Sequence, residues 1–530
     1  MKMVKSLILG SAAGLIAMSG AQAADLPVKA KAVEYVRICS LYGAGFYYIP
    51  GTDTCIKLGG YVRIDTTFNG GGYGQPFYNA DGGQGNRFRD QFLSRSRMAI
   101  TVDTRTATEY GVVRTFGQGD FQFQNFGTSN IGSAATNFSG APLNNALLST
   151  AGGGYVAVEM VFIQFAGFTF GKSSSAFAAP WNGYPGNNNS FLMGGHDTVT
   201  GVNNIQYTAQ FGNGVSGTIG LDDPTVFHRT SVQNLALGVS ASGTGTNAYG
   251  GVVAPDIVGN IRVDQAWGLL QLSAGAHLVN ASYNNLSAGG AANNLSEISG
   301  HPDSKWGWAV QGALQIKNIP TGAGDDIKIS AVYAQGNTKE VISTSGASPS
   351  FAMFGSSGLG YQSVGFANTS DGVYLPGVGG TNGIILTKAW GVRGAFNHNW
   401  DPYWSSSLWG SYAGVRYDGS NTDAVNGNLT SAKGAYCAGF AATHPGQVAA
   451  AAAAGTYSCN PDFNIAQVGV VTRWTPVKNL TFSAEVGAFF LDQKMTGSSV
   501  FTAAAPKPTA LYEFKDQSTV FLNVCVQRNF

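Results

Sequence analysis

Charged residues are scarce in this chain. Asp, Glu, Lys and Arg together make up 11% of its 530 residues, whereas a soluble globular protein carries roughly 25%. A plain soluble multidomain enzyme is therefore disfavoured. Positive and negative charges also nearly cancel, because the formal net charge is +1 at pH 7. Without a basic excess there is no general electrostatic argument for binding nucleic acid, and we expect no nucleic-acid partner.

Long apolar runs are missing beyond the N-terminus, so the sequence predicts no membrane-spanning helix in the mature chain. The N-terminus has a different pattern. Lys2 and Lys5 precede the apolar segment 7–18, and the tripeptide Ala-Gln-Ala at 21–23 supplies a cleavage site. Together they indicate a signal peptide at residues 1–23, so we expect an exported protein. A short anchor helix is the alternative, but the apolar segment is too short to span and no stop-transfer pattern follows.

Cysteine is rare, with five in the chain. Cys39 with Cys55 and Cys437 with Cys459 each flank a Gly-, Ala- or Tyr-rich loop, which favours two disulfides in an oxidising compartment and leaves Cys525 over. Metal binding is the rival interpretation. The chain has no CxxC motif, its six histidines are scattered, and none stands near a cysteine at ligand spacing. We therefore expect no metal site and no cofactor.

What the sequence does contain is short segments in which apolar and polar residues alternate. In residues 479–491 one parity carries Leu, Phe and Val side chains, and the other carries Thr481, Ser483 and Glu485. A period of two is typical of a β-strand with one apolar face and does not fit a helix. Sixteen such segments are predicted, at residues 56–69, 88–104, 109–124, 154–165, 168–173, 202–212, 215–221, 256–264, 268–279, 305–317, 326–335, 386–399, 403–418, 464–474, 479–491 and 516–530.

The connections between these segments are alternately short and long. Asn213-Gly214 is a two-residue hairpin signal, whereas 336–385 and 419–463 are long connections. Antiparallel barrels of outer membranes have this alternation, with tight periplasmic turns, long outer loops, apolar residues toward lipid and polar residues toward the lumen. A sheet in lipid must close on itself, because every backbone polar group there needs a partner.

The sequence therefore predicts an all-β fold, a transmembrane antiparallel β-barrel of about 16 strands at residues 56–530, after an N-terminal segment at 24–55 that contains the first cysteine pair. A soluble sandwich or propeller is the alternative. It would not need outward aromatic residues near strand ends, such as Trp306, Trp308 and Trp474.

Two segments resemble a known family. VEYVRICSLYGAGFYYIPGTDTCIKLGGYVR at 33–63 is similar to the N-terminal signature of the alphaproteobacterial porin family, and VFIQFAGFTFGKSSS at 161–175 resembles the family's strand before its constriction loop. The C-terminal Phe530 agrees, as an assembly signal of such barrels. The resemblance implies a homotrimeric outer-membrane channel, in contact with lipid and lipopolysaccharide, for passive diffusion of small hydrophilic solutes and ions.

The resemblance also implies a loop that folds into the barrel and narrows the channel. Its candidate is residues 174–201. In the family this loop commonly carries acidic residues that face an arginine cluster on the wall, whereas Asp197 is its only acid here. This departure weakens the expectation of a strong field between loop and wall.

Strand parity assigns several charged residues to the lumen. Arg63, Arg95 and Arg97 lie on adjacent predicted strands and are the candidates for a constriction. The alternative is that inward charges merely solvate a wet lumen. The basic excess among them suggests a weak anion preference. The predicted pore-lining residues are Lys57, Arg63, Asp65, Arg95, Arg97, Asp197, Arg262, Arg393, Arg473 and Glu485.

Parity fails in one predicted strand, because Glu159 and Gln164 lie on opposite faces. Either one polar residue points outward or the strand contains a β-bulge. An outward Glu159 would be tolerable against a neighbouring subunit, which would weakly support oligomerisation. A misplaced strand boundary is the plainer alternative, and Arg114 presents the same ambiguity.

Enzyme motifs are not supported. Residues 166–173 nearly match a phosphate-binding loop, but Ala166 stands where the first glycine is required. The acidic doublets at 222–223 and 325–326 lack the further ligands that calcium needs, and the histidines show no triad spacing. We expect no catalysis. An adhesin or recognition barrel of the outer membrane and a substrate-specific sugar channel stay open as alternatives, while a secreted β-rich hydrolase would need paired carboxylates in a cleft.

Overall fold

The structure is a computed structural model that describes residues 37–78, 91–124, 154–189, 191–196, 200–226, 228–240, 243–285, 299–343, 350–357, 362–444, 457–502 and 507–530. The chain divides into two units, residues 1–56 and 57–530. The predicted signal peptide at 1–23 lies outside the described residues.

The described part of the first unit is a small disulfide-bonded segment. Cys39 and Cys55 are bonded, with their Cα atoms 6.0 Å apart. Strand β1 (Tyr47–Tyr48) pairs antiparallel with Cys55 and Ile56, and the 3-10 helix η1 (Ser40–Tyr42) precedes it. Phe46 packs against the two buried cysteines. The bond closes a segment that is too short to form a core of its own.

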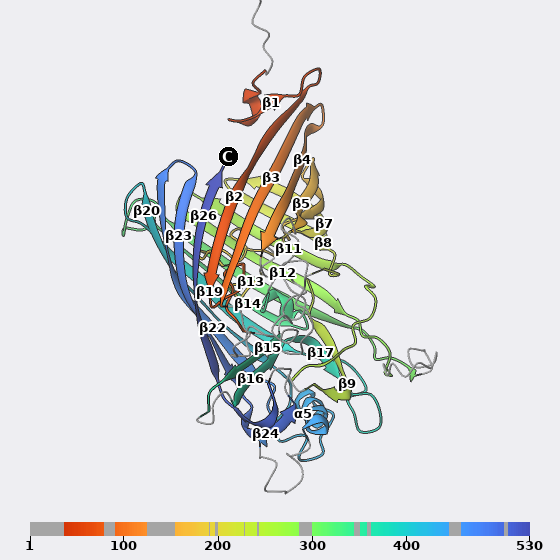
Figure 1. Cartoon of the computed structure of the whole chain (residues 1–530). Coiled ribbons are helices and arrows are strands. Elements are labelled where there is room, and N and C mark those ends of the chain that lie inside the picture. Colours follow the sequence, from red (N-terminus) through yellow and green to blue (C-terminus); the bar gives the residue numbers. More distant parts are fainter. Residues whose placement is uncertain are drawn as a thin grey trace, which may run out of the picture. The chain divides into compact units, whose positions relative to one another are not determined.

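Sixteen antiparallel strands form a closed barrel in the described residues (Figure 1). Each strand pairs with the next along the chain, and β26 pairs with β2 to close the sheet. All sixteen predicted segments are strands of this barrel, with shifts only at their ends. The strands are β2 (Thr54–Phe68), β3 (Phe92–Thr108), β4 (Gly111–Gln124), β5 (Tyr155–Phe165), β6 (Phe168–Ser173), β7 (Val202–Gly212), β8 (Val215–Asp222), β11 (Asp256–Gln265), β12 (Gly268–Val279), β13 (Lys305–Lys317), β14 (Asp326–Gln335), β19 (Lys388–Asn399), β20 (Trp404–Arg416), β22 (Phe463–Val477), β23 (Leu480–Gln493) and β26 (Gln517–Asn529).

The two faces of the strands differ as the alternation predicts. On β22 the side chain of Val468 faces outward and is 48% exposed, whereas the adjacent Gln467 is inward and 2% exposed. Tight turns join strands at one end of the barrel. The turn between β7 and β8 uses Asn213 and Gly214, whose φ angles of 50° and 73° suit a two-residue hairpin.

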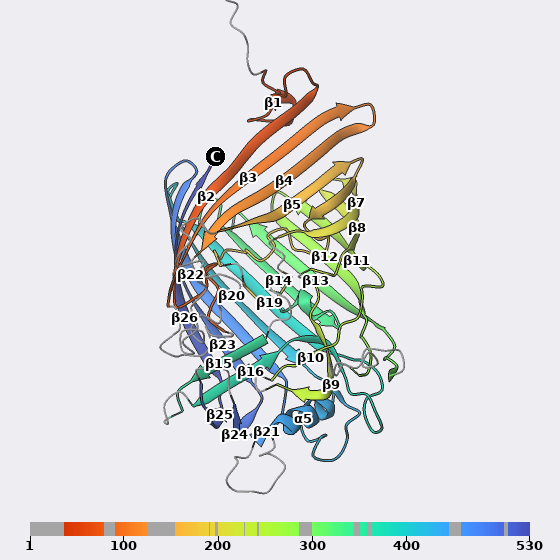
Figure 2. The ribbon, with the colours of Figure 1, turned by 45° about the vertical axis from the view of Figure 1, so that its right-hand side comes forward.

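The long connections are folded, which the alternation pattern does not predict. Two small sheets form from them: one contains β9 (Ser231–Val239), β10 (Gly245–Asn247), β17 (Ser370–Tyr374) and β18 (Ile385–Leu386), and the other contains β15 (Ser350–Gly355), β16 (Ser363–Asn368), β21 (Tyr457–Ser458), β24 (Thr496–Thr502) and β25 (Thr509–Phe514). In Figures 1 and 2 these sheets gather at the lower end of the barrel, away from the C-terminus.

A hydrophobic core holds these connections together. Phe351, Phe366 and Phe440 from the connections are buried with Phe463 and Phe489 from the barrel strands. Aromatic side chains of this size supply large apolar contact areas. Their spacing in the sequence is irregular, so no periodic signal marks them as a core.

The helix α5 (Ala432–Thr443) packs into the same hydrophobic core as the two small sheets. It begins at Ser431, whose side chain accepts a hydrogen bond from the Gly434 backbone N–H at 2.9 Å, a typical N-cap. Cys437 of the helix is bonded to Cys459, with Cα atoms 5.7 Å apart, as the cysteine pairing predicts. No helix among the described residues has both the length and the apolar character needed to cross a bilayer.

Candidate functional site

The described part of the constriction loop, residues 174–189, 191–196 and 200–201, lies against the inner wall of the barrel. Phe177 of this loop is fully buried. The Gln271 side chain on β12 donates a hydrogen bond to the Ala178 carbonyl at 2.7 Å, and Gln311 on β13 donates to the Phe177 carbonyl at 2.9 Å. Inward amides, which parity places in the lumen, thus serve as anchors for the loop.

Arg393 on β19 is the principal charged anchor of the loop. Its side chain is 1% exposed. Nη1 donates to the Leu192 carbonyl at 3.0 Å, and Nη2 donates to the Asn182 carbonyl at 2.7 Å and to the His196 carbonyl. The guanidinium is suited to this role because its fork of N–H groups reaches several acceptors at once. Arg393 is inward, as predicted, but it holds the loop rather than facing open water.

Arg473 and Glu485 hold the middle of the loop. Arg473 donates to the Gly186 carbonyl at 2.5 Å and to the Asn188 side chain at 3.1 Å. Glu485 is fully buried and accepts a hydrogen bond from the Asn188 backbone N–H at 2.8 Å. Both predicted lumen residues therefore bind the loop through its backbone and the Asn188 side chain, in a loop whose only acidic residue in the sequence is Asp197.

Gln467 provides a further anchor. Its Oε1 accepts from the Met193 backbone N–H at 2.8 Å, and its Nε2 donates to the Phe191 carbonyl at 3.0 Å. One side chain thereby satisfies a donor and an acceptor of the loop at the same time. The described residues of the loop are therefore hydrogen-bonded to strands β12, β13, β19, β22 and β23.

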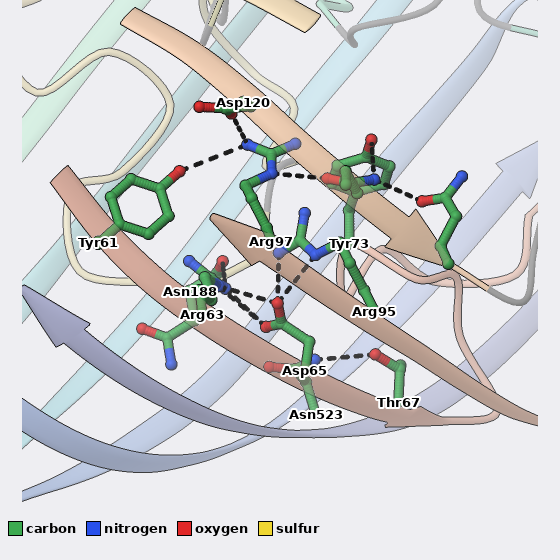
Figure 3. Close-up of polar contacts among 12 residues, drawn as sticks. Tyr61, Arg63, Asp65, Thr67, Tyr73, Arg95, Arg97, Asp120, Asn188 and Asn523 are labelled. Atoms are coloured by element: carbon green, nitrogen blue, oxygen red, sulfur yellow. Dashed lines mark hydrogen bonds and ion pairs between the residues drawn. The ribbon is translucent and has the colours of Figure 1, made fainter. Parts of the chain in front are cut away.

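The wall formed by β2 to β5 carries a charged cluster, defined as Arg63, Arg95, Arg97, Asp65, Asp120 and Glu159. Figure 3 labels every member except Glu159. Asp65 on β2 is fully buried between two arginines. Its carboxylate accepts from Nη2 of Arg63 at 2.9 Å and from Nε of Arg95 at 2.9 Å. The predicted arginine group is therefore brought together, with Asp65 at its centre.

Arg97 on β3 organises the second half of the charged cluster. Its Nη1 lies 2.6 Å from Asp120 and 3.4 Å from Glu159, and its Nε donates to Gln122 at 2.6 Å. The ring of Tyr73 lies against this side of the charged cluster, with its centroid 5.6 Å from the Arg97 guanidinium carbon, within cation–π range.

The charged cluster also meets the constriction loop. Nη2 of Arg63 donates to the Asn188 carbonyl at 3.4 Å, and Figure 3 shows Asn188 beside Arg63. Asn188 therefore links the charged wall to Arg473 and Glu485. No pattern in the sequence singles out Asn188, because it lies in a run of three asparagines in a connection.

Sequence reasoning missed Asp120 and Tyr73 as members of this site. Asp120 shares the inward parity of Gln122 and Gln124 on β4, so alternation could have identified it. Tyr73 lies in the connection after β2, where no periodicity applies. With three arginines and three carboxylates the formal charges of the cluster cancel, and the basic excess that suggested an anion preference is absent from this site.

A β-bulge resolves the parity conflict in β5. The β4–β5 pairing shifts between Gln118 and Gly119, so that Glu159 has no paired residue opposite it. Residues on both sides of the bulge then point inward: Glu159 approaches Arg97 and Gln164 accepts from Arg114 at 2.9 Å. Glu159 is thus not an outward residue and gives no support for a subunit contact.

Two of the remaining predicted lumen residues, Lys57 and Arg262, lie apart from the charged cluster. Lys57 is exposed near the start of β2. The side chain of Arg262 is 35% exposed and pairs with Asp264 at 2.8 Å, near the tight turn after β11. Asp197 lies outside the described residues.

Polar groups at the tight-turn end also form a connected set. The Asp325 carboxylate accepts from the Thr321 hydroxyl at 2.7 Å and from the Asn399 backbone N–H at 2.8 Å, and lies 2.6 Å from the His398 ring. Burial alone would raise the pKa of Asp325, but these hydrogen bonds and the nearby imidazole outweigh it and lower the pKa to about 2. The carboxylate is charged at any physiological pH.

The C-terminal Phe530 closes the seam of the barrel. Its backbone exchanges hydrogen bonds with Gly60 on β2, at 3.1 and 3.2 Å. Gly60 has a φ of 151°, and a Cβ atom there would lie 2.0 Å from the Ala99 carbonyl oxygen, so glycine is required. The ring of Phe530 is 62% exposed.

Comparisons with known proteins agree with this architecture. The family model of the porin subfamily matches residues 25–523. Porin Omp2b of Brucella suis is 34% identical over 271 residues, which are 50% of this chain and 64% of that protein. Porin Omp2b of Brucella abortus (strain 2308) is 35% identical over 273 residues, 50% of this chain and 63% of that protein. The matched region thus spans just under two thirds of these relatives.

A solved structure shows the same fold. The outer membrane channel DcaP of Acinetobacter baumannii superposes with a TM-score of 0.51, covering 91% of this chain and 99% of that chain at 13% identity. The family model extends over most of the chain, from the N-terminal segment to the last strand. This protein belongs to the porin subfamily and is a multi-pass β-barrel of the bacterial outer membrane.

Proposed function

We propose that the protein is a passive channel for small hydrophilic solutes and ions. The observation that carries the proposal is the arrangement of the constriction loop against one side of the lumen, with the charged cluster on β2 to β5 meeting it at Asn188. Such a narrowing, lined by fixed charges and backbone dipoles, lets hydrated solutes pass while limiting their size.

A second set of inward charges supports a wet lumen. Asp103 pairs with Arg105 at 3.1 Å and with Arg114 at 2.9 Å, and the two arginine side chains are 30% and 28% exposed. Ion pairs that keep this much exposure on the inner face support the presence of water beside them, because fully desolvated charges are costly. The outward residues of the same strand, such as Met98 and Ile100, are apolar and exposed, as a lipid-facing surface requires.

The proposed channel has weak charge selectivity. The charges of the cluster cancel as a whole, with two arginines on Asp65 and two carboxylates on Arg97. The field across the narrowing therefore arises from separated positive and negative groups and not from a net charge. Nothing among the described residues favours the adhesin or the substrate-specific channel, and we assign no catalytic role to any residue.

A homotrimer is part of the proposal, supported by membership of the porin subfamily. In the outer membrane its outward faces would contact lipid and lipopolysaccharide. Chemical cross-linking of the detergent-purified protein, read by mass, is expected to give trimers. A monomeric species at all protein concentrations would remove this part of the proposal and leave the channel itself untouched.

Planar-bilayer recording of the refolded full chain tests the channel. We expect ohmic openings in three equal steps, with a reversal potential near zero in a tenfold KCl gradient. Silence from protein that is folded by heat-modifiability would mean a plugged barrel and would end the proposal. Currents that a single sugar blocks saturably would instead indicate the substrate-specific channel.

A further inference from the structure

Three of the six histidines, scattered in the sequence, meet inside the barrel at the end where the long connections fold. His196 comes from the constriction loop, His228 from the connection after β8, and His277 from β12. All three side chains are at most 2% exposed. The rings of His196 and His228 lie 5.5 Å apart.

Two acidic side chains face the first two histidines. Glu340, in the 3-10 helix η3 (Thr338–Glu340), contacts Nδ1 of His196 through Oε2, and its Oε1 lies 3.8 Å from Nε2 of His228. Asp222, at the end of β8, places Oδ2 3.8 Å from the same Nε2. Nitrogen and carboxylate atoms from His196, His228 and Glu340 all lie within 4.8 Å of one another.

Several of these atoms are short of hydrogen-bonding partners in the part of the chain that the structure describes. Nε2 of His228 and both carboxylate oxygens of Asp222 are buried without a hydrogen bond of ordinary length, and the Ser175 side chain is the neighbouring donor of Asp222. Asp222 is 0% and His228 is 1% exposed. Leaving a buried polar atom without a partner costs about 1–3 kcal/mol, and more for a charged group. Two of these atoms, Nε2 of His228 and Oδ2 of Asp222, face each other across 3.8 Å, a separation that a shared ligand would bridge.

The groups behind the histidines fix their orientation. Nδ1 of His228 lies 3.2 Å from Asp256, whose other oxygen lies 2.6 Å from Nδ1 of His277. With the proton on Nδ1 held by Asp256, the lone pair of His228 Nε2 points at Glu340 and Asp222. A carboxylate behind a histidine in this manner is the usual support of a metal-binding imidazole.

Buried carboxylates around the histidines also favour the binding of a cation. Asp222, Asp256, Glu340 and Asp371 are buried at 0–1% exposure around the three histidines. The surroundings of His228 are therefore strongly negative.

We propose that His196, His228, Glu340 and Asp222 bind one divalent transition-metal ion of the zinc class. Two imidazoles and two carboxylates form a donor set that suits Zn²⁺. Ligands about 2.0–2.1 Å from a tetrahedral ion stand about 3.4 Å apart. The two separations of 3.8 Å exceed this by a few tenths of an ångström, whereas the direct contact between His196 and Glu340 is shorter than this. Side-chain rotations must therefore close the first two separations and open the third when the ion binds.

The proposed ion joins three parts of the protein. His196 belongs to the constriction loop, Glu340 to the connection after β14, and Asp222 and His228 to the end of β8 and the segment after it. Binding to the folded state alone stabilises that arrangement by linkage. The inference concerns a site beyond the narrowing and does not depend on channel activity.

Metal analysis of the purified full chain tests the proposal. After removal of metal by a chelator and incubation with Zn²⁺, gel filtration should retain one Zn²⁺ per chain. Co²⁺ in its place should give the intense visible absorption of a tetrahedral site. The wild-type protein answers this question without any variant, and the absence of both signals would overturn the proposal in favour of a purely structural network of histidines and carboxylates.

Variants locate the ion. Asp222→Asn and His228→Gln should abolish stoichiometric retention, and Asp256→Asn, behind His228, should weaken Zn²⁺ affinity about 10- to 100-fold. His301→Gln is the matched control, because His301 is exposed in a loop and should leave binding unchanged. Unaltered retention in the Asp222 and His228 variants, or loss in the His301 variant, would show surface binding and refute the assignment. Heat-modifiability on gels verifies that each variant is folded.

Discussion

The anchoring of the constriction loop by Arg393 yields a quantitative prediction. Arg393→Met keeps an unbranched apolar stem but removes the three hydrogen bonds to the carbonyls of Leu192, Asn182 and His196. Hydrogen bonds to charged groups contribute about 1.5–3 kcal/mol each, so the three together stabilise the loop by on the order of 5 kcal/mol. Hydration of the freed carbonyls makes the measured loss smaller.

The loss should be local. Arg473 and Glu485 still hold the middle of the loop at Gly186 and Asn188, and Gln467 still holds Phe191 and Met193. We therefore expect loosening at Asn182 and at 194–196, where Arg393 was the anchor, while the rest stays in place. Single-channel recording should then show a larger mean conductance and more current noise than the wild type. The unfolding temperature in detergent should also fall.

Arg262→Met is the matched control. Arg262 also lies on the inward parity, but it loses only a part-exposed ion pair with Asp264, which contributes about 0–1 kcal/mol. Its conductance noise and unfolding temperature should stay near those of the wild type. If Arg393→Met behaves like this control in both measurements, Arg393 does not hold the loop and the account of the constriction is wrong.

Three further predictions concern the wall, the charged cluster and the tight turns. Val468→Arg places a charge on the exposed outer face of β22 and should reduce the free energy of folding into lipid vesicles by about 2–4 kcal/mol. Val468→Leu should leave it nearly unchanged. Equal folding of both variants would mean that the strand register is wrong. Arg97→Gln leaves the negative charges of Asp120 and Glu159 in excess and should shift the reversal potential in a KCl gradient toward cation selectivity. Asp65→Asn removes a negative charge and should shift the reversal potential the opposite way. Shifts of the same sign in both variants would contradict the charge balance of the cluster. Asp325→Asn should lower the unfolding temperature above pH 4. The effect should disappear as the pH falls to about 2, because a carboxylate with a lowered pKa stabilises the fold only while it is charged. A difference in unfolding temperature between variant and wild type that does not change with pH would refute this role.

Alternation made the barrel predictable. A strand in lipid must present one apolar face, so each of the sixteen segments carries its own signal, and even a short strand such as β6 was found. Inward parity likewise identified Arg63, Arg95 and Arg97 as neighbours on the lumen wall. The ends of strands were less certain, because pairing rather than pattern decides where a ladder stops. The β-bulge at Glu159 was visible only as a conflict in parity.

The fold of the long connections could not be predicted from the alternation of apolar and polar residues. The core of Phe351, Phe440 and Phe489 is built from segments far apart in the chain. No repeating spacing of apolar residues in the sequence predicts that these side chains meet. The same holds for the partners of the constriction loop. Arg393 and Gln467 were inward by parity, but only the folded chain brings the loop carbonyls to them.

By itself, the sequence determined the closed barrel, the cysteine pairs and the inward charges, because each follows from a rule that acts over a few residues: alternation, pairing in an oxidising compartment, and the exclusion of charge from lipid. Tertiary structure alone decided the neutral balance of the charged cluster and the meeting of His196 with His228 and Glu340. Those depend on distances between strands and loops that lie far apart along the chain, which no local pattern encodes.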